Sequence, residues 1–289
     1  MADSERTYAL TRRGTAPCDE DFVRVGDGWG VLLDGATGLG EQRNPPIGYG
    51  SLPQWYASTI GTSIANRMES VHDADELRGV IARAFASAND RFADMYGTGM
   101  DASQAPSATL CIARHANGKV VLALLGDSPV IVIRDGRPET HALHDLGRLD
   151  AQALEAMDIA SRTSTRRLSG TEKRDAISGI LVANRLMLGH SDGYWALSPA
   201  LPDAVTHASI VTLPDDGVTA VYGMSNGAYA TISKYGIVTE QGIDKAFRDC
   251  HHASGVIADM RRVEHADMDF DRFPRFKVSD DASVFRIGL

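Results

Sequence analysis

The chain has 289 residues, 43% of them hydrophobic and 23% charged, values typical of a soluble globular protein with a substantial core. Its formal net charge of -9 argues against a nucleic-acid partner, because such binding relies on clustered Lys and Arg. Three well-separated cysteines without CxxC spacing, no signal peptide and no membrane-spanning apolar run favour a reduced cytoplasmic protein with no membrane partner. With no repeat and no linker in the sequence, we expect residues 1–289 to form a single domain.

The first part of the chain predicts a hairpin followed by two helices, over residues 22–33, 52–70 and 74–95. Asp27-Gly28 suits the hairpin turn, because Asp and Gly readily adopt the backbone conformations of tight turns. In the second helix, apolar residues recur at helical spacing and form one stripe, and Asp73 or Asp75 can cap its start.

The next part has the two-residue period of strands. Asn117-Gly118 and Asp135-Gly136 each join two apolar runs, and Asn-Gly is the strongest short signal for a hairpin. We therefore expect an antiparallel meander of at least four strands. Residues 145–174 are polar and show no clear period beyond a short helix, so we expect an irregular segment there that shapes specificity.

The last part of the chain mixes strands with helix. Residues 179–193 are expected to return to strand, with a turn near Asn184. A strand, a largely helical stretch and a closing strand follow over residues 218–224, 236–263 and 279–289. Because helices and antiparallel strands are grouped along the chain rather than alternating, the sequence predicts an α+β fold.

Acidic residues directly flank many of these strand-like runs: Asp34, Asp127 and Asp192 follow one, and Glu20, Asp21, Asp280 and Asp281 precede one. Each of them alone fits a turn. If neighbouring strands carry Asp at the same edge of a sheet, however, like charges converge, which is unfavourable without a cation between them. Oxygen ligands without His or Cys suit Mg²⁺ or Mn²⁺ rather than Zn²⁺.

Five stretches occur in a fixed order along the chain: LLDGATG, SATLCIAR, LALLGDSPVIVIRDG, LMLGHSDGYWAL and DDASVFRI. In this order and spacing they resemble the motif set of the metal-dependent PPM (type-2C) protein phosphatases, over residues 19–287. The resemblance implies two antiparallel β-sheets in a central sandwich flanked by helices, an αββα four-layer arrangement, which agrees with the α+β class. It also implies phosphoserine or phosphothreonine in a phosphorylated protein as the substrate.

The resemblance further implies a site for two Mg²⁺ or Mn²⁺ ions, formed by Asp34, Gly35, Asp192, Asp280, Glu20 and Asp21. Asp34 would bridge both ions, the Gly35 carbonyl would bind one of them, and Asp192 and Asp280 would complete the second. Glu20 and Asp21 would hold metal-bound water. A hydroxide between the ions would attack phosphorus, with Asp34, Asp192 and Asp280 as the catalytic ligands. Asp127 and Asp281 would support the site without binding metal.

Two features depart from the family pattern. Ala16 stands where the family commonly has the Arg that binds the substrate phosphate, and Arg12 and Arg13 are the nearby candidates for that role. Asp101 is the only candidate ligand for a third metal ion. A catalytically weak phosphatase-like protein with a regulatory or binding role is therefore an alternative.

A second alternative comes from Gly189–Gly193, whose GHSDG sequence matches the G-x-S-x-G nucleophile elbow of α/β-hydrolases, with Ser191 as nucleophile. Pro199 and Pro202 stand where that fold requires a helix, and the strands upstream are expected to be antiparallel rather than parallel. The sequence assigns no pathway and no oligomeric state.

Overall fold

A computed structural model describes residues 7–39 and 43–289 of the chain, so Gly40, the last residue of the GVLLDGATGLG stretch, lies outside the described residues. Strands in the described part form two five-stranded sheets, in the orders β1-β10-β9-β6-β7 and β2-β3-β4-β5-β8, and all pairs are antiparallel. The strands are β1 (Tyr8–Arg12), β2 (Phe22–Gly26), β3 (Trp29–Ala36), β4 (Ser107–Ala116), β5 (Lys119–Leu125), β6 (Val130–Arg134), β7 (Arg137–His141), β8 (Ser209–Pro214), β9 (Val218–Met224) and β10 (Ala282–Gly288).

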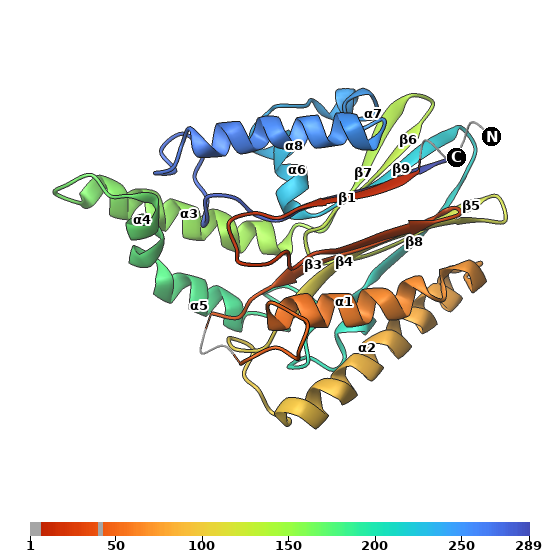
Figure 1. Ribbon diagram of the computed structural model, residues 1–289, viewed down its shortest axis with the longest axis horizontal. Helices are drawn as coiled ribbons and strands as arrows, with labels where there is room; N and C mark the ends of the chain where they lie inside the picture. Colours follow the sequence, from red (N-terminus) through yellow and green to blue (C-terminus); the bar gives the residue numbers. More distant parts are fainter. Residues whose placement is uncertain (1–6, 40–42) are drawn as a thin grey trace.

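Helices cover both outer faces of the sandwich (Figure 1). They are α1 (Leu52–Ala65), α2 (Ala74–Tyr96), α3 (Asp145–Thr163), α4 (Gly170–Ala176), α5 (Ser178–Leu186), α6 (Asn226–Ser233), α7 (Ile243–Ala246) and α8 (Cys250–His265), with short 3-10 turns at Met68–Ser70, Ala204–His207 and Glu240–Gly242. Helices α1 and α2 pack on one sheet and α6 to α8 on the other, whereas α3 to α5 project from one end. This arrangement confirms the predicted α+β four-layer fold. Within the described ranges, no helix combines the length and the apolar character needed to cross a bilayer.

The two sheets meet in a dry interface because successive strand residues alternate between faces. On β3, Val31 and Leu33 pack toward α1 and α2, while Leu32 packs toward the other sheet. The largest side chain between the sheets is Phe285, and glycine makes room for its ring on both sides. A Cβ atom at Gly30 would lie 2.4 Å from the ring, and one at Gly223 would lie 2.1 Å from it.

The predicted hairpin turns are confirmed. Asn117 and Gly118 have φ of 53° and 71°, and Asp135 and Gly136 have φ of 49° and 73°, as the central residues of type I′ turns require. The prediction of one four-stranded meander is wrong, because β4 and β5 lie in one sheet and β6 and β7 in the other. Turn chemistry fixes which strands pair locally, but it does not fix which sheet a hairpin joins.

Helices α1 and α2 are confirmed within a few residues of the predicted bounds, and Asp73 caps α2 by accepting a hydrogen bond from the Glu76 amide. The irregular segment predicted over residues 145–174 is wrong: α3 runs through most of it and buries Leu149, Ala153 and Met157 at four-residue spacing. The strand predicted over residues 179–193 is also wrong, because it forms α5 followed by turns. Short apolar runs do not distinguish a strand from a partly buried helix.

Candidate metal centre

Several strand ends meet at one end of the sandwich and bring acidic side chains together there. Asp34 lies near the end of β3, and Asp21 directly precedes β2. Asp280 lies just before β10, and Asp127 lies where the chain crosses from β5 in one sheet to β6 in the other. These four carboxylates are close enough for their charges to interact, since Asp21, Asp280 and Asp127 all raise the pKa of Asp34.

The buried Asp21 and the half-buried Asp34 form the centre of this group. Burial raises the pKa of both carboxyls well above the ordinary value, and neighbouring carboxylates raise them further. Neither oxygen of Asp21 accepts a hydrogen bond of normal geometry, although the nearby Ser283 hydroxyl lowers the pKa of Asp21 somewhat. A buried carboxylate without partners, next to a second one, is destabilising unless a cation lies between them. The two side chains therefore fit a divalent cation.

Asp19, shortly before β2, and Asp281, directly before β10, have partners within the protein. Asp281 accepts hydrogen bonds from the Gly14 amide at 2.7 Å and from the Glu20 amide at 2.8 Å. Asp19 accepts from the Thr11 hydroxyl and from the Asp21 amide. Oxygens of Asp19, Asp21 and Asp281 all lie within 4.8 Å of one another. Asp19 and Asp281 thus shape the loop that presents Asp21.

Glu20 and Gly35 lie against each other beside Asp34. The Thr37 hydroxyl is within 2.7 Å and 2.9 Å of the two carboxylate oxygens of Glu20, which fixes this buried side chain. A Cβ atom at Gly35 would lie 2.4 Å from the Glu20 carbonyl oxygen, so only glycine allows this approach of the two backbones. The structure thus places Glu20, Asp21, Asp34 and Gly35 together, as the sequence analysis expected of a shared site.

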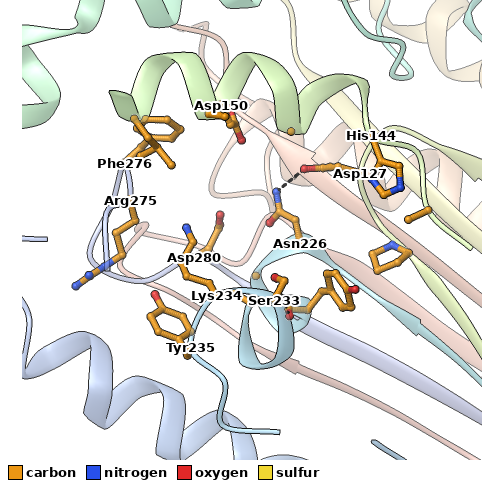
Figure 2. A pocket seen from close by; sticks show the side chains of 18 of the residues that line it. Asp127, His144, Asp150, Asn226, Ser233, Lys234, Tyr235, Arg275, Phe276 and Asp280 are labelled. Atoms are coloured by element: carbon orange, nitrogen blue, oxygen red, sulfur yellow. Dashed lines mark hydrogen bonds between the residues drawn. The ribbon is translucent and has the colours of Figure 1, made fainter. Parts of the chain in front are cut away.

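The end of β9 contributes a loop that the sequence analysis did not consider. Ser225 caps α6, and the Asn226 amide donates to Asp34 at 3.3 Å. The Asn226 side chain donates to Asp127 at 3.1 Å (Figure 2). A Cβ atom at Gly227 would lie 2.0 Å from the Asp281 carbonyl oxygen, so this loop packs directly on the start of β10. The signal in the sequence was the stretch VTAVYGMSNG, an apolar strand that ends in Ser-Asn-Gly.

Asp192 lies elsewhere. Its side chain is exposed and accepts a hydrogen bond from Ser191 at 3.3 Å, and its carbonyl accepts one from Arg148. It is not among the groups whose charges shift the pKa of Asp34 most. The structure therefore brings Asp34, Asp21 and Asp280 together but not Asp192, and the loop at this place in the site carries Asn226. An acidic residue at a strand end marks Ser-Asp-Gly as the ligand motif, whereas the amide of Ser-Asn-Gly gives no such signal.

A lysine side chain, that of Lys277, lies next to these carboxylates. Lys277 lies 2.5 Å from Asp280, and the Asp281 amide donates to the same oxygen at 2.9 Å. Burial lowers the pKa of Lys277, but the charges of Asp280 and Asp34 outweigh it and raise the pKa overall. The predicted phosphate ligands have other hydrogen-bond partners: Arg12 donates to the Thr11 carbonyl and to Ser254, and Arg13 donates to the Pro17 carbonyl.

A cavity of about 660 Å³ opens beside Asp127 and Asp280 (Figure 2). It lies between α3, α6 and residues 275–280, and its volume is within the usual range for ligand pockets. Asp150 enters it from α3, and burial together with the charge of Asp127 raises the pKa of Asp150 to about 6. Lys234 enters from the end of α6; burial lowers its pKa, and the charge of Asp150 acts in the opposite direction.

The structure excludes the α/β-hydrolase alternative. Ser191 follows α5 and a series of turns rather than a sheet strand, and both sheets in the described ranges are antiparallel. An α/β-hydrolase requires a nucleophile directly after a strand of a parallel sheet. Asp101, the candidate for a third metal ion, is exposed and accepts a hydrogen bond from the Ser103 amide.

Comparisons with known proteins support the fold. No family model matches the sequence, and no curated protein matches it significantly. Among solved structures, the serine/threonine phosphatase PstP/Ppp from Mycobacterium tuberculosis is 16% identical, with 98% of each chain covered and a TM-score of 0.60. The PPM Ser-Thr phosphatase MsPP from Mycobacterium smegmatis, in complex with cacodylate, is 17% identical, with 98% of this chain and 97% of that chain covered and a TM-score of 0.53.

A third structure is the catalytic domain of the serine threonine protein phosphatase PstP in complex with two manganese ions. It is 13% identical, with 97% of this chain and 96% of that chain covered and a TM-score of 0.56. At such low identities the likeness concerns the fold, and it extends over nearly the whole of each chain. The chain therefore has the fold of the PPM serine/threonine phosphatases.

Proposed function

We propose that the chain is a Mg²⁺- or Mn²⁺-dependent phosphatase that acts on phosphoserine or phosphothreonine in proteins. The observation that carries the proposal is the buried, unpartnered Asp21 beside the half-buried Asp34, whose charges are unfavourable without a cation. The PPM fold supports it, and so does the PstP structure with two manganese ions.

Asp34, Asp21 and the carbonyl of Gly35 would hold a divalent cation, with Glu20 and Asp280 beside it. A bound Mg²⁺ or Mn²⁺ supplies a water of lowered pKa as the nucleophile and neutralises charge on the phosphoryl group. Among the chain's own groups, the Asn226 amide orients Asp34, and the Thr37 hydroxyl orients Glu20. No serine or cysteine is required as a nucleophile.

The cavity beside Asp280 would receive the substrate. Lys234 and Lys277 line it and can balance the charge of a phosphate, whereas Arg12 and Arg13 are not among its lining residues. Helix α3 forms one wall through Asp150 and Leu154, so the segment predicted to shape specificity does border this cavity. Shortening α3 should therefore change the preference among phosphopeptides more than the hydrolysis of a small aryl phosphate.

A second candidate function is phosphoprotein binding with little turnover. Asn226 favours it, because an amide stands where a carboxylate ligand would be expected, and so does Ala16 in place of the phosphate-binding Arg. In that case the chain would bind a phosphopeptide in the presence of Mn²⁺ without hydrolysing it.

Hydrolysis of p-nitrophenyl phosphate and of a phosphothreonine peptide with Mn²⁺, Mg²⁺ or EDTA tests these functions. We expect metal-dependent turnover that falls at least about 100-fold in Asp34→Asn, since even residues behind metal ligands contribute about 10- to 100-fold. Asp175→Asn, an exposed carboxylate on α4, is the matched control and should retain full activity. Turnover that persists in EDTA would contradict the metal-dependent mechanism, and metal-dependent peptide binding without turnover would favour the second function.

A further inference from the structure

The carboxylates of the candidate metal centre fall into two halves that differ in how their charge is balanced. In the first half, Asp21 is buried and Asp34 half-buried, and both oxygens of Asp21 lack a hydrogen-bond partner among the described residues. In the second half, Asp280 and Asp127 already have nitrogen donors from the protein itself. Asp21 has no such donor, and the ammonium of Lys277, whose charge also acts on Asp34, is paired directly with Asp280.

Lys277 provides the positive charge in the second half. Its ammonium lies 2.5 Å from Asp280, and the Asp281 amide donates to the same carboxylate oxygen. The Lys277 side chain lines the cavity and is 51% exposed. A divalent cation at Asp280 would have to displace this ammonium or lie next to it, and like charges at that distance repel strongly.

Asn226 also deprives a second cation of a carboxylate ligand. Its side-chain amide points at Asp127 and donates to it (Figure 2). Its backbone amide donates to Asp34, so Asn226 places N–H groups against both carboxylates. An amide contributes no negative charge, whereas a hard divalent cation depends on carboxylate ligands to offset its lost hydration. The second half thus has one carboxylate fewer and one ammonium more than a binding site for a second ion would need.

We propose that the chain binds a single divalent cation, at Asp21 and Asp34, and that Lys277 and Asn226 occupy the place of a second one. This inference rests on the proposed function for the identity of the ion. In the bound state, the Lys277 ammonium faces the cavity from Asp280 and balances charge on the substrate phosphate opposite the ion. The other oxygen of Asp127 is buried without a partner, and an ion bound there is the competing arrangement.

Titration of the metal-stripped full-length chain with Mn²⁺, followed by calorimetry and by the electron paramagnetic resonance signal of free Mn²⁺, tests this directly. We expect one ion per chain up to about 1 mM, the range in which weak oxygen-ligand sites fill. Asp21→Asn should weaken binding of this ion at least about tenfold. Two ions in the wild type would overturn the inference while leaving the proposed function intact, whereas no bound ion would overturn both.

Variants of the second half provide the converse test. The double variant Asn226→Asp/Lys277→Ala should bind a second Mn²⁺, because it restores a carboxylate and removes the ammonium. Lys277→Arg keeps the charge and should still bind one ion. Lys234→Ala is the matched control, since it removes a lysine from the same cavity whose main carboxylate partner is Asp150 rather than Asp280. A double variant that folds, as judged by circular dichroism, and still binds one ion would contradict the assigned roles of Lys277 and Asn226.

Discussion

The ends of β3 and β9 are built alike and carry different charges. Each is a buried strand with a glycine at its end or soon after it, and a Cβ atom at either glycine would collide with a neighbouring carbonyl, at 2.4 Å for Gly35 in β3 and 2.0 Å for Gly227 in the first turn of α6. Yet β3 presents the carboxylate of Asp34, whereas β9 presents the amide of Asn226. The backbone geometry of both segments depends on close packing. It can therefore be the same at two places that carry different charges.

The largest effect on stability is expected from a substitution that gives the end of β9 a carboxylate like that of β3. Asn226→Asp places another carboxylate against Asp34 and Asp127 and removes the hydrogen bond to Asp127. Without metal, this should lower the free energy of unfolding by about 3 kcal/mol, because a buried charge is left unpaired. Added Mn²⁺ should recover much of the loss.

Thermal unfolding in EDTA and in Mn²⁺ checks this effect. Asn226→Ala is the matched variant, since it removes the same hydrogen bond without adding charge and should be insensitive to Mn²⁺ beyond the wild-type response. Equal unfolding temperatures for Asn226→Asp and Asn226→Ala in EDTA would show that repulsion between carboxylates does not lower the stability at this position.

The close backbone packing at the ends of β3 and β9 can be tested by substituting the glycine at each place. Gly35→Ala and Gly227→Ala should each cost about 1–3 kcal/mol of stability, because a Cβ atom in either place meets backbone rather than a flexible side chain. Gly255→Ala in α8 is the control: no atom lies within 4 Å of the added Cβ, and it should leave stability unchanged or slightly higher. Denaturant unfolding measures all three, and a harmless Gly227→Ala would mean that the β9 loop is loosely packed.

Substitution of Asp21 is expected to have a smaller effect, which is to stabilise the metal-free protein. Its pKa is raised above 3.8 in the folded chain, mainly by burial, so the folded chain holds a proton that the unfolded chain has lost. The stability of the metal-free protein should therefore fall as the pH rises from about 4 through the raised pKa. Asp21→Asn should flatten this decline and raise the metal-free stability near neutral pH by about 1–2 kcal/mol.

Unfolding temperatures measured from pH 4 to pH 8 in EDTA test this prediction, with Asp175→Asn as the exposed control. In Mn²⁺ the order should reverse, because the ion stabilises only the chain that binds it. A wild-type protein whose metal-free stability rises with pH over this range would contradict a buried, unpaired Asp21.

The smallest effect on stability and turnover is expected from substitution of Asp192. Its side chain is exposed and lies outside the group around Asp34, so Asp192→Asn should change stability by no more than about 0.5 kcal/mol. Metal-dependent turnover should stay within about twofold of the wild type. A loss as large as that of Asp34→Asn would restore the ligand role that the sequence pattern predicted for Asp192.

Local sequence determined much of this protein. The Asn-Gly and Asp-Gly turns set three hairpins, and the apolar stripe of α2 set its buried face, because backbone preference and burial act within a few residues. The strand-end carboxylates Asp21, Asp34 and Asp280 were likewise visible in the sequence, since a charged residue beside a buried strand is conspicuous.

Tertiary structure alone decided which strand ends meet. The hairpins β4-β5 and β6-β7 lie in different sheets, which brings Asp127 to the candidate metal centre. Packing of β9 beside β10 brought Asn226 there instead of Asp192, and folding of residues 275–280 placed Lys277 against Asp280. These contacts join residues far apart in the chain, and their energy comes from burial between whole elements, which no local pattern records.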